Sequence, residues 1–237
     1  MKNIALILVA FLFYGFSSGI EDKTYVGVAI DNKSLEFIYK EIHEELFEEG
    51  KHIRTITSFV CDQNNEFAKR ELDFRKSFQK PTYRLIDKRS GLIEEVTYKG
   101  DNQFDIRYRK NAKSKLKEKS IFVPEPAIVD GGFNYFIKNN WDRILSEEKL
   151  NFNFLSVAFQ DYFSFRIYRT KEKETKSNTV VLKMETQSAL LRMLLNPIYI
   201  SYDLNTRRIL KYEGISNIRN NKGSSYKALL QYPELGP

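Results

Sequence analysis

Apolar and polar residues alternate along most of the chain after about residue 24, which is the pattern of half-buried β-strands. The runs are separated by short turns rich in Gly, Asn, Asp and Glu, at 48–50, 64–65, 90–91 and 100–102. Strands joined by such short turns are antiparallel neighbours, so the sequence predicts a long meander. The alternating runs are 35–47, 53–60, 67–74, 83–87, 93–98, 104–109, 151–154, 163–167, 180–185, 198–204, 209–214 and 226–232.

The alternation is interrupted once, at Pro124-Glu125-Pro126, because proline lacks the N–H that a β-ladder needs. Asp130 follows and is expected to cap a helix through its side-chain oxygen. The spacing of the next apolar residues predicts an amphipathic helix over about 130–145, and a second short helix is expected over about 188–195, before Pro197. The stripe of the first helix consists of Phe133, Phe136, Ile137, Trp141, Ile144 and Leu145.

A meander of this length must curl to cover its apolar face, and a helix can lie across the concave side. We therefore expect a mainly β (α+β) fold: a half-barrel with the helices near 130–145 and 188–195 on its concave side. No low-complexity linker or repeat divides the sequence, so residues 20–237 are expected to form a single domain.

Residues 1–19 have the three parts of a secretory signal peptide. A short basic start precedes the apolar run Ile4–Phe16, and Ser17-Ser18-Gly19 supplies small residues before a cut after Gly19. The alternative is a permanent anchor, but 13 helical residues reach only about 20 Å, against a hydrocarbon core of about 30 Å. No later segment approaches 18 uncharged apolar residues, so the exported chain is expected to have no transmembrane span.

The net charge of +7 is spread over 38 basic and 31 acidic residues. Export argues against a nucleic-acid partner, which leaves a solvated mixed surface or a preference for anionic lipids. Four lysines alternate, so that a strand would project all of them to one side. This stripe either protects a sheet edge or docks an anionic partner. Its members are Lys113, Lys115, Lys117 and Lys119.

The sequence offers little chemistry for a metal, a cofactor or a nucleophile. His43 and His52 lie on opposite arms of the first hairpin, where His43 should face about residue 55, and the offset of about 10 Å is too large for a shared zinc ion. Cys61 is the only cysteine, so no intramolecular disulfide can form. There is neither a G-x-S-x-G elbow nor a phosphate-binding loop. No metal and no cofactor are therefore predicted.

Two hypotheses about acidic and aromatic residues remain open. A carboxylate-dependent envelope hydrolase would draw on Glu94, Glu95, Asp130, Asp161 and Glu213. Glu94 and Glu95 would point to opposite faces of a strand.

Aromatic residues, 14% of the chain, either fill the core or line an apolar groove. The leading hypothesis is a non-enzymatic binder of a lipid, a lipidated partner or another envelope component. A docking scaffold that uses a sheet edge or the lysine stripe is the third alternative, and the sequence indicates no oligomeric state. In the leading hypothesis Phe133, Phe136 and Trp141 form a lid, and Phe152, Phe154, Phe163 and Phe165 form the groove.

Several short stretches resemble a family of uncharacterised exported proteins of Gram-negative bacteria. The resemblance covers the chain from about Thr24 onward and, more loosely, is similar to the antiparallel half-barrels of periplasmic lipoprotein carriers. It implies a periplasmic location and a half-barrel fold, and it carries over no catalytic residue. The stretches are Arg70–Phe74, Val123–Pro126, Val129–Phe133, Tyr202–Leu204 and Tyr212–Ile218.

Overall fold

A computed structural model of the chain describes residues 20–173 and 178–232, so the expected signal peptide at 1–19 lies outside the described residues. Strands make up 58% and helices 9% of the structure, which confirms a mainly β fold. The strands are β1 (Ile20–Asp31), β2 (Phe37–Glu48), β3 (Lys51–Val60), β4 (Glu66–Asp73), β5 (Thr82–Asp87), β6 (Leu92–Gly100), β7 (Gln103–Arg109), β8 (Lys117–Phe122), β9 (Ala127–Ile128), β10 (Leu150–Ser156), β11 (Asp161–Thr170), β12 (Thr179–Thr186), β13 (Ile198–Asp203), β14 (Ile209–Arg219) and β15 (Ser225–Gln231).

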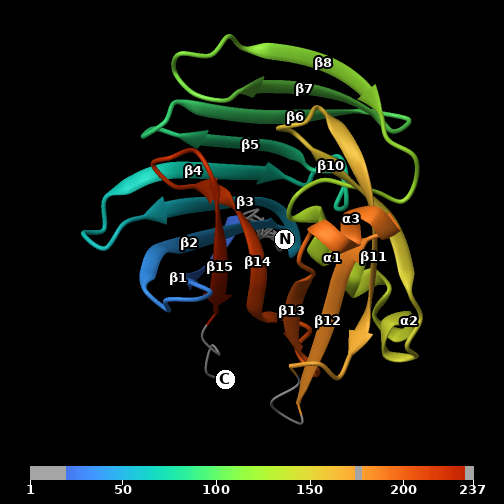
Figure 1. The fold of residues 1–237 in the computed structure, drawn as a ribbon. Helices are drawn as coiled ribbons and strands as arrows, with labels where there is room; N and C mark the ends of the chain where they lie inside the picture. The colour runs from blue at the N-terminus through green and yellow to red at the C-terminus, as the bar shows by residue number, and fades with distance from the viewer. Residues whose placement is uncertain (1–19, 174–177, 233–237) are drawn as a thin grey trace, which may run out of the picture.

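The described strands form one sheet in the order β8-β7-β6-β5-β4-β3-β2-β1-β15-β14-β13-β12-β11-β10-β9, and the sheet is not closed. Neighbouring strands are antiparallel, except that β9 and β10 are parallel. The edge strands β8 and β9 are nevertheless joined by residues 123–126 alone, a connection that reaches at most about 17 Å. The sheet must therefore bend back on itself. In Figure 1 the strands β2–β8 run across the view and β10–β15 run down it.

The helices differ from the sequence prediction in their detail. In place of one helix over 130–145 there are α1 (Gly132–Asn139) and α2 (Trp141–Leu145), because Asn140 leaves the helical region with φ −112°. Asp130 is not the N-cap: Gly131 is, without a side-chain cap. The short helix near 188–195 is α3 (Ala189–Leu194). In the described part of the chain, no helix is both long and apolar enough to cross a bilayer.

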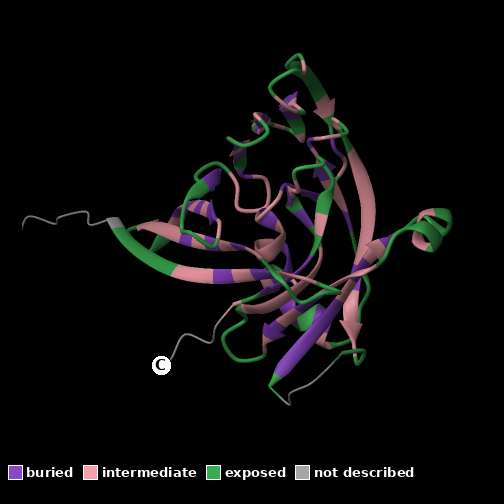
Figure 2. Cartoon of the chain, turned by 60° about the vertical axis from the view of Figure 1, so that its left-hand side comes forward, coloured by how far each residue is buried: buried purple, intermediate pink, exposed green. Residues whose placement is uncertain are grey.

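Two hydrophobic clusters support the bent sheet. The first is built mainly on β2–β7 and includes Phe59, Leu85 and Phe104. The second packs α1 and α2 against β10–β13, with Ile137 and Ile167 fully buried. Tyr212 of β14 contacts both clusters. In Figure 2 buried and intermediate residues run along the strands, and the exposed residues lie mainly in the turns.

Candidate functional site

Most of the aromatic residues predicted to form a lid and a groove pack against one another. The ring of Phe152 lies 5.6 Å from Phe133, 5.3 Å from Phe136 and 5.9 Å from Phe165. Phe154 joins the same group through Phe165, at 6.4 Å. Phe152 is 1% exposed, so the middle of this aromatic cluster is already filled by the chain's own side chains.

The remaining two predicted residues, Trp141 of the lid and Phe163 of the groove, make no ring contact with this cluster. Trp141 packs edge-on against Tyr202 at 5.7 Å, and both rings are buried. Phe163 contacts Phe159 at the turn between β10 and β11, at 5.3 Å. Two shallow surface pockets of about 170 and 220 Å³ lie elsewhere, on β5–β7 and around the β1–β2 turn, and neither is lined by the seven predicted residues.

A surface that the sequence did not single out lies on α3, which has no buried residue. We call Leu190, Met193, Leu194 and Leu195 the α3 surface; they are 69%, 84%, 74% and 47% exposed. Large apolar side chains gathered at one exposed place commonly mark an interaction site. Figure 2 shows this helix standing out from the body at the right of the view.

Hydrogen bonds hold the N-terminal end of α3 in place, although the apolar side chains of the helix lie in solvent. Ser188 caps the helix, its hydroxyl accepting a hydrogen bond from Leu191 N at 3.3 Å. Arg192 Nη1 donates to the carbonyl oxygens of Thr186 and Gln187, at 3.0 and 2.7 Å. These contacts hold the helix at the end of β12, so the α3 surface is presented in a defined place.

A second candidate is a chain of buried polar side chains on the inner face of β2–β6. Across these strands the paired residues are His43, Thr57, Arg70, Leu85 and Glu94, which form one row. His43 was expected opposite about residue 55 but pairs with Thr57, because the turn is centred between Glu49 and Gly50 and a register shift between Leu46 and Phe47 adds one more residue. Because the row faces the interior, its charged groups form their hydrogen bonds and ion pairs with other buried side chains.

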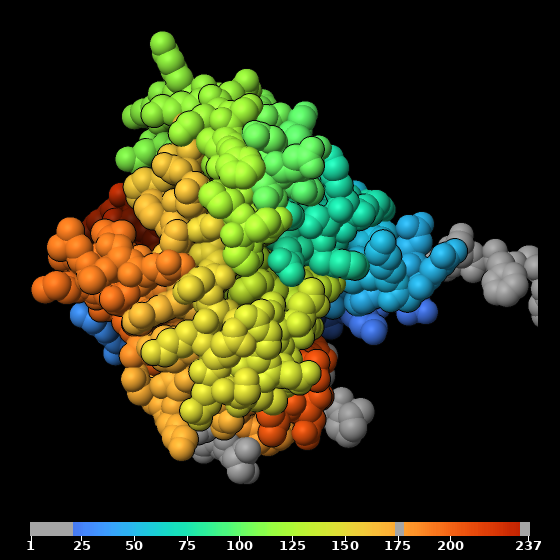
Figure 3. Space-filling model, turned by 90° about the vertical axis from the view of Figure 1, so that its right-hand side faces the viewer, coloured from blue at the N-terminus to red at the C-terminus, as the bar shows by residue number. Residues whose placement is uncertain are grey.

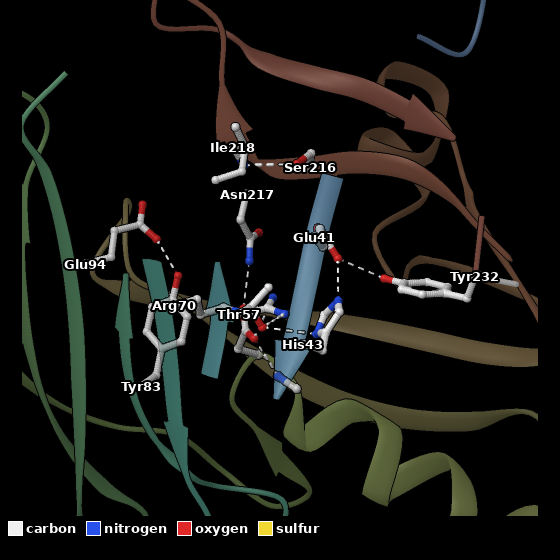
Figure 4. Close-up of polar contacts among 12 residues, drawn as sticks. Glu41, His43, Thr57, Arg70, Tyr83, Glu94, Ser216, Asn217, Ile218 and Tyr232 are labelled. Atoms are coloured by element: carbon white, nitrogen blue, oxygen red, sulfur yellow. Dashed lines mark hydrogen bonds and ion pairs between the residues drawn. The ribbon is translucent and has the colours of Figure 1, made fainter. Parts of the chain in front are cut away.

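Hydrogen bonds connect the first half of this polar chain. His43 Nε2 and the Tyr232 hydroxyl both donate to Glu41 Oε2 at 3.0 Å. The other ring nitrogen, Nδ1, lies 3.1 Å from Thr57 Oγ1. Tyr25 stacks on the imidazole with 4.5 Å between ring centroids. Figure 4 shows the Tyr232 hydroxyl pointing at Glu41, which lies on the same strand as His43.

The second half of the polar chain centres on Arg70. Its Nη2 donates to Thr57 Oγ1 at 3.3 Å, and its Nη1 lies 3.2 Å from Asp130 Oδ1. Asn217 Nδ2 donates to the other oxygen of Asp130 at 2.7 Å. This explains why Asp130 does not cap α1: its carboxylate is bound by β4 and β14. Three of the stretches that carried the family resemblance thus meet at one place.

Burial and charge act in opposite directions on these groups. Burial alone would raise the pKa of Glu41, but the hydrogen bond and charge of His43, followed by the charge of Arg70, hold it below its ordinary value. Burial likewise disfavours the charged guanidinium of Arg70, and the carboxylates of Asp130 and Glu41 outweigh it and raise its pKa. The polar chain is therefore a set of charges that are compensated internally.

The order Thr57–His43–Glu41 has the form of a nucleophile, a base and an acid. Thr57 is 0% exposed, however, and its hydroxyl already accepts a hydrogen bond from Arg70. A substrate has no access to this oxygen. The arrangement instead ties β2–β4 to Asp130 just before α1, to β14 and to Tyr232 just after β15.

Of the five carboxylates proposed for a hydrolase, Glu94 and Asp130 lie near enough for the charge of Asp130 to act on Glu94, but both side chains are in the interior and only 10% exposed. Glu94 faces inward and accepts a hydrogen bond from Tyr83 at 3.0 Å, whereas Glu95 faces outward between Arg84 and Arg107, as the alternation predicted for this pair. Asp161 is exposed at the start of β11, and Glu213 is paired with Lys173. Asp130 belongs to the polar chain.

Glu94 gives the structure a testable pH dependence. Burial raises its pKa and outweighs the opposing hydrogen bond from Tyr83 and charge of Arg219. The unfolded chain therefore ionises this carboxyl more readily than the folded protein does. The stabilisation is full below the ordinary pKa of a glutamate and is lost as the pH rises through the raised value.

Glu94→Gln should remove this loss, because the amide stays neutral and still accepts a hydrogen bond from Tyr83. Urea midpoints between about pH 4 and pH 8 should fall less with rising pH in the variant than in the wild type. Parallel profiles for the two proteins would contradict the assignment.

The lysine stripe is divided between a strand and a loop. Lys117 and Lys119 lie in β8, whereas Lys113 and Lys115 precede it. Glu118 points to the opposite face and pairs with Arg107. None of the four lysines has a carboxylate partner among the described residues, so their positive charge is not neutralised locally.

The described residues hold no group of three His, Cys, Asp or Glu side chains placed to bind a metal ion. His52 bonds to Tyr135 of α1, and Cys61 is a half-buried free thiol. Comparison of the chain with protein-family models, curated proteins and solved structures found no match in any of the three. The resemblance to exported proteins and to lipoprotein carriers therefore stays a prediction.

Proposed function

We propose that the protein is an exported, non-enzymatic binder of lipid that works in the periplasm. In this proposal the bent sheet is a half-barrel scaffold with α1 and α2 on its concave side, and α3 is the contact element. The observation that carries the proposal is the exposure of Leu190, Met193 and Leu194 on a helix whose base is held by Ser188 and Arg192.

The apolar area on α3 supports weak, reversible binding. Burying a fully exposed Leu or Met side chain contributes about 1.5–3 kcal/mol, so the three most exposed residues, which are 69–84% exposed, together contribute about 3–7 kcal/mol. An interaction of that size corresponds to a Kd between about 10 μM and about 3 mM of accessible lipid. A half-barrel that docks transiently on lipid and leaves again fits this value better than a permanent anchor does.

The α3 surface supports lipid binding better than the predicted aromatic groove. A ligand in that groove would have to displace Phe152 from its contacts with Phe136 and Phe165. The side chains of α3 need no such rearrangement, because they already lie in solvent.

The proposal is tested by vesicle sedimentation of the purified protein and of the double variant Met193→Glu/Leu194→Glu. Two carboxylates in place of two exposed apolar groups should weaken binding to phosphatidylcholine vesicles about tenfold or more. The fold should not change, because neither side chain is buried.

Leu35→Glu is the matched control, because Leu35 is 62% exposed on the β1–β2 turn, away from α3. It should bind vesicles as the wild type does. A wild type that ignores vesicles, or a double variant that binds as well as the control, would overturn the proposal.

A further inference from the structure

We infer that the lipid surface contacted by α3 is anionic, and that the lysine stripe Lys113–Lys119 supplies the contact with its headgroups. The inference rests on the proposed function and names the class of lipid. Its starting point is that four lysines within seven residues lack a carboxylate partner. Clusters of lysines beside an apolar element are typical of binding to anionic membranes.

The strand geometry places two of the four lysines on one face of β8, and the other two precede the strand. Lys117 and Lys119 pair with Tyr108 and Ile106, which face inward, so the two ammonium groups lie on the same side of β8. The acid between them in the sequence, Glu118, lies on the other side and is bound to Arg107. β8 is an edge strand whose residues are nearly all exposed, so no other strand covers the lysines.

A continuous path of contacts leads from the lysine stripe to α3. Lys119 Nζ donates to the carbonyl oxygen of Gln160 at 3.0 Å, beside Phe159, which is 72% exposed. Phe159 contacts Phe163, and the next residue, Ser164, accepts a hydrogen bond from Gln187 N immediately before α3.

The same path can be followed on the surface of the molecule. In Figure 3 the orange bulge of α3 projects at the left of the molecule, with the β10–β11 turn above it and β8 at the top. The lysine stripe, Phe159 and the α3 surface therefore lie along one side of the molecule.

The combination of the lysine stripe with the α3 surface favours a bilayer over an acidic protein as the partner. Lysine is a flexible point charge that follows mobile headgroups without requiring a fixed geometry. A weak apolar contact and a polybasic patch together give stable membrane association, which either one alone does not. Each lysine near an anionic surface strengthens binding about fivefold, so the stripe would turn the weak contact of α3 into a selective one.

The inference is tested with vesicles of phosphatidylcholine alone and of phosphatidylcholine mixed with phosphatidylglycerol. The wild type should bind the mixed vesicles about tenfold or more tightly, and raised salt should remove the difference. Lys113→Glu/Lys115→Glu changes two loop lysines whose side chains have no hydrogen-bond partner in the described residues and should abolish the preference without altering binding to neutral vesicles. Lys117→Glu/Lys119→Glu, which changes the two lysines of β8, should also abolish the preference for anionic vesicles.

The control is Lys33→Glu/Lys40→Glu, which makes the same change in net charge on the β1–β2 hairpin, six strands away from β8 in the sheet. It should keep the preference for anionic vesicles. Equal binding of the wild type to both kinds of vesicle, or a preference that survives both stripe variants, would overturn this inference and leave the proposed function standing. A protein that binds neither kind of vesicle would overturn both.

Discussion

Arg70→Ala should destabilise the protein by about 3–5 kcal/mol, the cost of removing one partner from a buried ion pair. The Arg70 side chain is only 16% exposed, and it bonds to both Thr57 and Asp130. Without the guanidinium, Asp130 and Glu41 would lose the positive charge that compensates them. Urea unfolding should show a midpoint well below that of the wild type.

Arg84→Ala is the matched control, because Arg84 lies on the neighbouring strand β5 with its side chain 53% exposed and paired with Glu95. An exposed pair of this kind contributes about 0–1 kcal/mol. Equal losses in the two variants would contradict the view that the polar chain holds the fold together.

Phe152→Ala should cost about 3–5 kcal/mol, as large-to-small substitutions in a packed core do. Phe152 is 1% exposed and touches the rings of Phe133, Phe136 and Phe165. The surrounding rings belong to two different elements, α1 and β11, whose backbones are held by other contacts, so they cannot all move in to fill the space. Thermal unfolding should therefore occur at a clearly lower temperature.

The control for this variant is Phe163→Ala on the paired strand β11, since Phe163 is half-buried and its one ring contact in the described part of the chain is edge-on with exposed Phe159. Its loss should be much smaller. A Phe152→Ala protein as stable as the wild type would mean that the aromatic cluster is loosely packed, which would favour the predicted groove over a filled core.

The alternating pattern was sufficient to predict a mainly antiparallel β fold, because the two faces of each strand differ in polarity along the chain. It could not predict the pairing of β1 with β15, where Ala29 faces Leu230. β1 and β15 are the first and last described strands, and no short turn connects them that would reveal their pairing in the sequence. The break at Asn140 was also missed, because the apolar stripe continues on both sides of it.

The candidate site was harder to predict than the fold. Glu41 and His43 share their face of β2 with Tyr39, and all three are buried. An alternating pattern normally places polar residues on the solvent-facing side of a strand. The one sign of a buried polar chain was that Glu41 and His43 are two and four residues after Tyr39 and therefore point to the same face as this aromatic residue. The run Leu190–Leu195 is almost entirely apolar, and such a run predicts a buried helix rather than an exposed one.

The most direct test of the central claim places an environment-sensitive dye at Met193, which is 84% exposed. Cys61→Ala removes the only native thiol, and Met193→Cys provides the attachment site. When anionic vesicles are added, the account predicts a blue shift and a rise in dye fluorescence as α3 enters the lipid, with no such change for the same dye at Leu35→Cys. An emission spectrum at position 193 that is unchanged by vesicles would contradict it.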